Sequence, residues 1–184
     1  VAVAIRQFRP ALSRDTKQLG LLGLVFILVA LLARIGSLVN WDGAPFLIPV
    51  ALGSMLITIL VDGQVAVLTT LLSALVTGMV TDYALEPMVV AFTGGLTGVL
   101  SVNRAAQRSD VTRAGFLVGL ACAVTMLALG LARGSTALVS LAWVGLVNGL
   151  LSSVGALGLL PYLEAAFGIT SAIRLLELAN PNQP

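Results

Sequence analysis

Residues 19–39, LGLLGLVFILVALLARIGSLV, contain one charged side chain, that of Arg34. A helix needs about 20 consecutive apolar residues to cross a hydrocarbon core of about 30 Å. This stretch therefore predicts a transmembrane helix. The whole chain has the same character, with 58% hydrophobic residues, 10% charged residues and a mean hydropathy of +1.05. These values lie outside the range of soluble domains and predict an integral membrane protein.

Further apolar stretches follow, separated by short polar segments. We predict an all-α polytopic transmembrane bundle with six complete spans, at about residues 19–39, 45–61, 65–80, 86–102, 114–131 and 136–160. Residues 1–18 are expected to hold the end of a preceding span and a basic cytoplasmic segment. Residues 161–184 are expected to form a cytoplasmic coupling segment with a short helix. We therefore expect the chain to be part of a longer protein.

The basic residues predict the orientation of the bundle. Most of them lie in two segments, one before the first span and one between the fourth and fifth spans: Arg6, Arg9, Arg14, Lys17, Arg104, Arg108 and Arg113. Cytoplasmic loops carry an excess of Lys and Arg, so both ends of the chain are expected in the cytoplasm. Arg34 and Arg133 are exceptions near outer span ends, where a long side chain can reach the headgroups. This pattern explains the net charge of +2 without a nucleic-acid partner.

Composition also limits the chemistry that this chain can perform. It has no histidine, and its one cysteine, Cys122, falls within a predicted span. Histidine is the usual general base and the commonest metal ligand. We therefore expect no catalytic site, no metal site and no cofactor in this chain. Asp62, Asp82 and Glu86 lie at predicted loops or span ends, and we interpret them as solvated loop residues.

Asn148 is the most prominent polar residue within a predicted span, and it lies between Gly145 and Gly149. An amide in the membrane interior must find a partner. We favour a hydrogen bond to a neighbouring helix, of about 1 kcal/mol, over a contact in a ligand cavity. Small residues four apart recur in other spans as well, and we interpret them as helix packing rather than as a dimer face. Assembly into a homo-oligomer remains open.

The end of the chain is predicted to couple the bundle to whatever follows it. Pro161 is expected to break the last span, and residues 162–168 to form an interfacial segment. A short helix is then expected around Arg174 and Glu177, which are three residues apart, and it should end at Asn180 before Pro181. The candidate coupling residues are Pro161, Glu164, Arg174, Glu177, Asn180 and Pro181.

Several of these segments resemble the membrane domain of seven-transmembrane HD-family phosphohydrolases. The most specific is LLPYLEAAFGITSAIRLLELANPNQP at residues 159–184, which resembles the junction between the membrane region and the HD domain. The other segments are RQFRP at 6–10, VDGQVAVLTTLLSALVTGM at 61–79 and QRSDVTRAGFLVGL at 107–120. The resemblance covers nearly the whole chain.

In that family an extracytoplasmic domain precedes the bundle, and a cytoplasmic HD domain with a His-Asp metal centre follows it and hydrolyses cyclic di-AMP. The resemblance implies a sensor and anchor module in the bacterial cytoplasmic membrane, partnered by those two domains and the lipid bilayer. No metal ligand of the family has a counterpart here. The alternatives are a small-solute carrier or substrate-binding membrane subunit, and a scaffold that recruits partners through residues 103–113.

Overall fold

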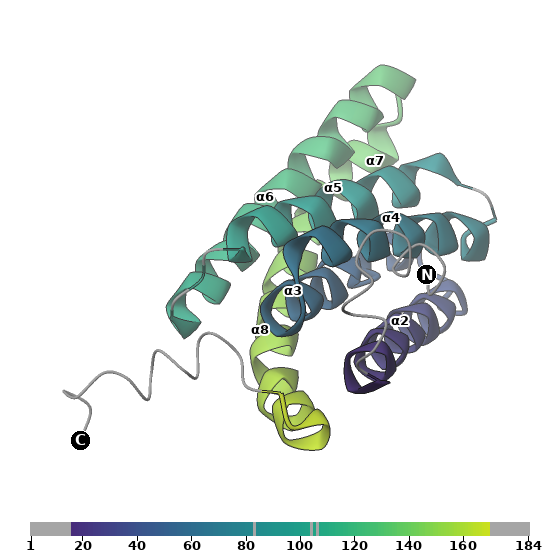
Figure 1. Ribbon diagram of the computed structural model, residues 1–184. Helices are drawn as coiled ribbons and strands as arrows, with labels where there is room; N and C mark the ends of the chain where they lie inside the picture. Colours follow the sequence, from purple (N-terminus) through teal and green to yellow (C-terminus); the bar gives the residue numbers. More distant parts are fainter. Residues whose placement is uncertain (1–15, 83, 104, 106, 170–184) are drawn as a thin grey trace.

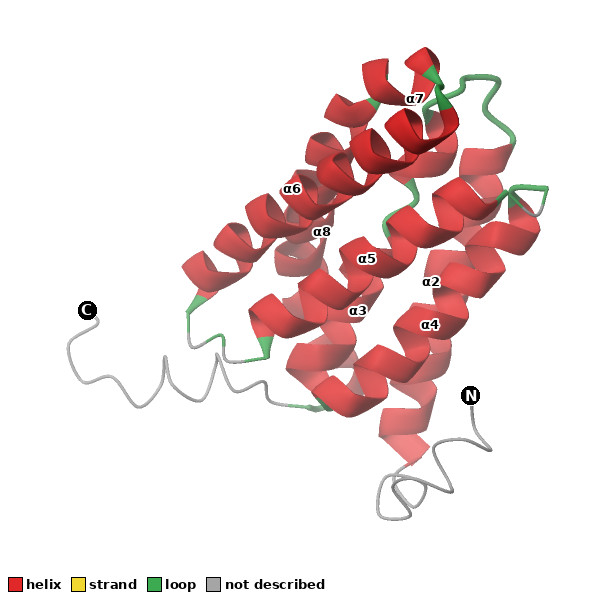
Figure 2. Cartoon of the chain, turned by 90° about the horizontal axis from the view of Figure 1, so that it is seen from above, coloured by secondary structure: helices red, strands yellow, loops and turns green. Residues whose placement is uncertain are grey.

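The computed structural model describes residues 16–82, 84–103, 105 and 107–169. Within this part of the chain all regular elements are helices, as Figure 1 and Figure 2 show. Some predicted features lie outside the described residues: Val1 to Ile5, the short C-terminal helix, Arg6, Arg9, Arg14, Arg104, Arg174, Glu177, Asn180 and Pro181. The predicted class, an all-α membrane bundle, is confirmed.

The described elements follow one another as α2 (Thr16–Ser37), η2 (Ala44–Leu47), α3 (Val50–Leu60), α4 (Gly63–Val80), α5 (Leu85–Val102), α6 (Arg108–Arg133), α7 (Thr136–Ser140) and α8 (Ala142–Phe167). Five of these helices, α2, α4, α5, α6 and α8, are long and apolar enough to cross a membrane. The predicted span at 45–61 corresponds to a shorter apolar segment, Ala44–Leu60. The count of six complete spans therefore stays a prediction.

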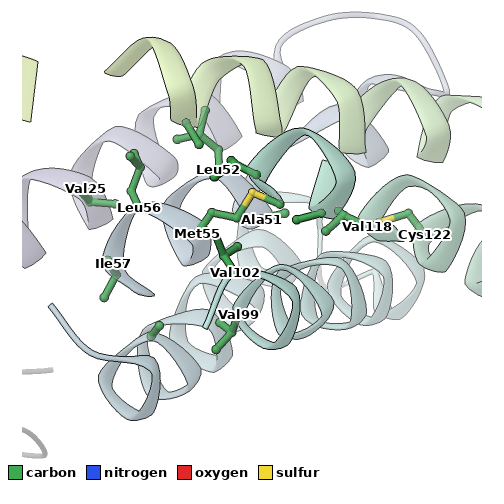
Figure 3. Packing of buried hydrophobic residues seen from close by; sticks show 14 of the residues in the cluster. Val25, Ala51, Leu52, Met55, Leu56, Ile57, Val99, Val102, Val118 and Cys122 are labelled. Carbon is green, nitrogen blue, oxygen red and sulfur yellow. The ribbon is translucent and has the colours of Figure 1, made fainter. Parts of the chain in front are cut away.

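α3 lies at the centre of the bundle. Of its 11 residues, nine are buried, among them Met55 and Leu56, which have no exposed surface. Figure 3 shows Met55 and Leu56 among side chains from three other helices: Val25 of α2, Val99 and Val102 of α5, and Val118 and Cys122 of α6. A helix surrounded in this way has little contact with lipid, so most of its side chains must fit against those of neighbouring helices.

Two helix starts have clear local causes. Asp62 caps α4, because its carboxylate accepts a hydrogen bond from the backbone N–H of Gln64 at 2.7 Å. The predicted spans at 45–61 and 65–80 leave only residues 62–64 between them, and the structure has a short turn with this cap there. α6 begins at Arg108, earlier than the predicted start near Ala114, because Gln107 and Asp110 form a reciprocal capping box. The charged residues at its start had suggested a loop, which was wrong.

α6 and α8 cross at close range, and glycines make this possible. A Cβ atom placed on Gly145 would lie 2.6 Å from the backbone nitrogen of Ala123, and one on Gly149 would overlap the backbones of Gly115 and Gly119. Contacts this close leave no room for any other residue. Figure 2 shows the two helices lying along each other. Four small residues, Gly115, Gly119, Gly145 and Gly149, thus serve packing within the chain.

α8 contradicts the predicted break at Pro161, because the helix runs through this proline to Phe167. A proline removes one backbone hydrogen bond, and helices in membrane proteins tolerate such a loss. Pro161 is exposed, while Leu160 and Leu163 beside it stay buried in the core. The helix ends instead at Gly168, which adopts a left-handed conformation with φ of 62°.

The break that the sequence reading missed lies in the second apolar segment. Pro49 separates the 3-10 helix η2 from α3, and Ile48 before it is extended, with φ of −62° and ψ of 114°. Proline disfavours the helical conformation in the residue that precedes it, and Ile48 follows this preference. The last predicted span is divided as well, at Leu141 between α7 and α8.

The helices define two ends of the bundle. At one end α2 begins close to where α8 finishes, so that a Cβ atom on Gly20 would lie 3.3 Å from Phe167 (Figure 1). Gly63 and Asn103 meet at the same end, which we call the 16/167 end. The opposite end holds the turn after α2, and there the rings of Trp41 and Trp143 lie 6.3 Å apart. We call it the Trp end.

Candidate functional site

Asn148 of α8 contacts the segment Ala44–Leu60, which we call the broken segment, at the break between η2 and α3. Its amide nitrogen donates hydrogen bonds to the backbone carbonyl of Phe46 at 2.8 Å and to that of Ile48 at 3.4 Å. Its amide oxygen accepts a hydrogen bond from the hydroxyl of Ser152 at 3.3 Å. The side chain is 4% exposed. The favoured interpretation, a hydrogen bond between helices, matches this geometry better than a ligand contact does.

The broken backbone explains why an amide is needed there. In a continuous helix, the carbonyl of Phe46 would accept from the N–H of Val50, but that N–H donates to Ile48 at 2.9 Å instead. Pro49 has no N–H to offer to Pro45. A backbone carbonyl without a partner in an apolar interior costs several kcal/mol. Asn148 supplies the donor that the phenylalanine carbonyl has lost.

Hydroxyl groups form two further contacts between helices, one of them buried and the other partly buried. Ser54 of α3 and Thr70 of α4 lie 2.6 Å apart, and Thr93 of α5 and Thr125 of α6 lie 3.2 Å apart. Each of these hydroxyls also lies within hydrogen-bonding distance of a carbonyl of its own helix. Such pairs fix the register of neighbouring helices, and they involve no reactive group.

The 16/167 end carries several of the predicted coupling and topology residues. Lys17 lies in the first turn of α2, and Arg108 and Arg113 lie in the first turns of α6. Glu164 of α8 is only 7% exposed and Pro161 is exposed on the same helix. The structure thus brings the basic starts of α2 and α6 and the last turns of α8 to one end of the bundle.

Two shallow cavities open at this end, on either side of the turn between α5 and α6. One has a volume of about 360 Å³ and is lined by Asp62, Gln64 and Asn103 together with apolar residues of α4 and α5. The other, of about 250 Å³, includes Asp110 and Arg113. Neither cavity is enclosed, and both lie away from Asn148. We assign no ligand to them.

At the Trp end the structure corrects one interpretation. Glu86 at the start of α5 had been interpreted as a solvated loop residue, but its carboxylate forms an ion pair with Arg133 at the end of α6. The two residues are 47 positions apart in the sequence, so their pairing has no local signal. Arg133 thus has a protein partner in addition to the headgroups that it was expected to reach.

Among residues 16–82, 84–103, 105 and 107–169, no group of three or more His, Cys, Asp or Glu side chains is arranged to hold a metal ion. The contacts around Asn148 and between the hydroxyl pairs join backbone carbonyls, hydroxyls and amides, which hold helices together. The arrangement can hold neighbouring helices in register. The break at Pro49 was not predicted from the sequence. A second proline four residues after Pro45, inside the predicted span, was the signal that could have indicated it.

Comparison with known proteins gives a family. The family model described as "7TM receptor with intracellular HD hydrolase" matches residues 1–171. The cyclic-di-AMP phosphodiesterase PgpH of Bacillus subtilis (strain 168) is 32% identical over 156 residues, which cover 79% of this chain and 22% of that protein. PgpH of Listeria monocytogenes serotype 1/2a (strain 10403S) is 32% identical over 152 residues, which cover 79% of this chain and 21% of that protein.

The chain thus spans about a fifth of the length of these curated relatives. No solved structure matches it. The matched family agrees with the helical bundle described above, with its long apolar helices. The chain is a multi-pass membrane protein that belongs to the family of 7TM receptors with an intracellular HD hydrolase.

Proposed function

We propose that this chain is the transmembrane sensor and anchor module of a membrane-bound HD-type phosphohydrolase that degrades cyclic di-AMP. The observation that carries the proposal is the match of residues 1–171 to a family whose description joins a 7TM region to an intracellular HD hydrolase. Both curated relatives are named cyclic-di-AMP phosphodiesterases. The bundle itself would hold the enzyme at the membrane, and the metal chemistry would belong to the HD domain.

The proposal includes an orientation in which the 16/167 end faces the cytoplasm of a bacterial cell. Lys17, Arg108 and Arg113 lie at this end, and residues before Lys17 add three arginines in sequence. The Trp end has Arg34 and Arg133, and Arg133 is paired with Glu86. The positive-inside rule therefore favours a cytoplasmic 16/167 end. An HD domain that follows α8 would then lie in the cytoplasm.

The alternative hypothesis, a small-solute carrier, was permitted by the helical hairpins and by Asn148 as a possible ligand contact. The amide of Asn148 is bonded to two backbone carbonyls and a serine hydroxyl, so it gives this hypothesis no support. The scaffold reading depends on basic residues that the membrane orientation already explains. Neither alternative has a specific observation in its support.

The test of the enzymatic part uses the product of the complete coding sequence that contains this chain. Purified in lipid nanodiscs, it should hydrolyse cyclic di-AMP, and replacement of the His-Asp pair downstream of Pro184 by alanines should abolish the activity. The soluble downstream domain, made without this chain, should be found in the cytosol instead of the membrane fraction. A coding sequence without a His-Asp pair, or a complete protein that leaves cyclic di-AMP intact, would overturn the proposal.

The orientation can be tested separately by cysteine labelling in a Cys122→Ala background. Asp42 at the Trp end and Ser109 at the opposite end are both exposed. A membrane-impermeant maleimide should label Asp42→Cys in intact cells and should label Ser109→Cys only after lysis. The reverse pattern would invert the proposed orientation.

A further inference from the structure

The segment from Ala44 to Leu60 cannot close its own backbone hydrogen bonds at the break. Pro49 ends η2 and has no side-chain cap to offer α3. The carbonyl of Phe46 depends on a donor from another helix, and the donor is the amide of Asn148, 102 positions away. The same amide also donates at 3.4 Å to the carbonyl of Ile48, which already accepts from the N–H of Val50. The conformation of this segment is therefore set by the position of α8.

α8 is attached on its other side to α6. Gly145 and Gly149 flank Asn148 and lie against the α6 backbone, where a Cβ atom on Gly145 would come within 2.9 Å of the Cys122 carbonyl carbon. Backbones packed so closely slide or separate as units, because no side chain between them can adjust. A movement of the broken segment must therefore either stretch the hydrogen bonds of Asn148 or carry α8 with it.

The two ends of this connection lie at opposite ends of the bundle. The turn before η2 contains Trp41, which packs against Trp143 near the start of α8 and is 40% exposed. From there α8 continues without interruption past Pro161 to Phe167, beside the start of α2. A helix of 26 residues is about 39 Å long, which exceeds the hydrocarbon thickness.

We propose that the hydrogen bonds from Asn148 to Phe46 and Ile48 form a latch that couples the turn around Trp41 to the far end of α8. This inference deepens the proposed function, on which it rests, by naming the route of a signal through the bundle. In the latched state the broken segment is held against α8. In the released state the segment rejoins α3 as a more regular helix, and the end of α8 shifts relative to α6.

Two substitutions open the latch from opposite sides. Asn148→Leu keeps a similar volume and removes the donor. Pro49→Ala restores a backbone N–H and the freedom of Ile48 to be helical, so that Val50 can donate to Phe46 without Asn148. Both are expected to favour the released state. Thr97→Val is the matched control, because the hydroxyl of Thr97 donates to the carbonyl of Thr93 in its own helix at 2.8 Å.

The test measures a distance in the complete protein, with its native cysteines replaced and the protein in nanodiscs. Spin labels at Ser109→Cys of α6 and Ala165→Cys of α8 are both on exposed positions at the 16/167 end. Asn148→Leu and Pro49→Ala should each shift the distance by about 2 Å or add a second population. Thr97→Val should leave it unchanged. Unchanged distances in a folded Pro49→Ala protein would overturn the latch, even if Asn148→Leu fails to fold.

The second readout is the rate of cyclic di-AMP hydrolysis by the same proteins. Coupling of ordinary strength predicts a change of about fivefold in both latch variants and none in the control. A shifted distance with an unchanged rate would also overturn the coupling. If the unmodified complete protein leaves cyclic di-AMP intact, the proposed function fails, whereas the latch itself is still decided by the distances.

Discussion

α2 and α3 lie against each other but have opposite surroundings. In the apolar part of α2, 28% of the residues are buried inside the bundle, compared with 44% in each of the other four long helices. Ile27 and Leu31 of α2 are more than half exposed. Of the 11 residues in α3, nine are buried. The two helices touch at Gly53, where a Cβ atom would lie 2.7 Å from a methyl group of Val29.

The difference shows what the length of an apolar helix indicates in a membrane protein. α2 is long and continuous because its outer face meets lipid, where any apolar residue is acceptable and every backbone group must be bonded within the helix. α3 is shielded by its neighbours, so it can be short and the chain can be interrupted just before it. Asn148 donates to the carbonyls of Phe46 and Ile48 at that break, and the hydroxyl of Ser54 in α3 lies 2.6 Å from that of Thr70 in α4. A long uninterrupted apolar helix therefore lies at the periphery of the bundle, and a shorter apolar helix lies at its centre.

The largest expected effect comes from filling the contact between these helices. Gly53→Leu should lower the free energy of unfolding by about 3 kcal/mol, because the new side chain has no space beside Val29 and Val25. Reversible unfolding in mixed detergent micelles measures this change. Gly23→Leu on α2 is the control, since no atom lies within 4 Å of the position of its Cβ atom. Equal losses for both variants would contradict the contrast between the helices.

A smaller effect is expected from creating space on the same two helices. Met55→Ala in α3 removes a fully buried side chain and should cost about 2 kcal/mol in unfolding free energy. Ile27→Ala in α2 changes a side chain that is 65% exposed, and lipid fills the space that it leaves. We expect less than about 0.5 kcal/mol there. The same unfolding measurement applies, and a larger loss for Ile27→Ala would place α2 inside the bundle.

The contrast also explains which features could be predicted from the sequence. The long apolar stretches predicted α2, α4, α5 and the lipid-facing parts of α6 and α8, because length and hydropathy are local properties. The place of Asp62 between two apolar stretches was predicted for the same reason. Pro49 and the capping residues Gln107 and Asp110 were local signals too, and they were overlooked.

Other features depend on contacts between distant residues. The partners of Asn148 lie about 100 positions away, and Arg133 pairs with Glu86 over 47 positions. A single sequence contains no pattern that links such residues. The continuation of α8 through Pro161 depends on burial of Leu160 and Leu163, which stabilises the helix on both sides of the proline. These features required the packed structure.

The smallest expected effect concerns the polar contact that α3 makes with α4. Thr70→Val removes the hydroxyl that lies 2.6 Å from Ser54, and it should lower the unfolding free energy by about 0.6 kcal/mol. The loss is small because Ser54 keeps the carbonyl of Val50 as an acceptor at 3.0 Å, so no buried donor is left without a partner.

Thr97→Val provides the comparison for this value, because the hydroxyl of Thr97 bonds to its own helix. A difference of about 0.6 kcal/mol between the two variants would measure the contact between helices alone. The Ser54→Ala variant and the double variant Ser54→Ala/Thr70→Val complete the cycle. An interaction energy of zero would mean that α3 is held by its apolar packing and by Asn148, and that the hydroxyl pair sets only the register of α4.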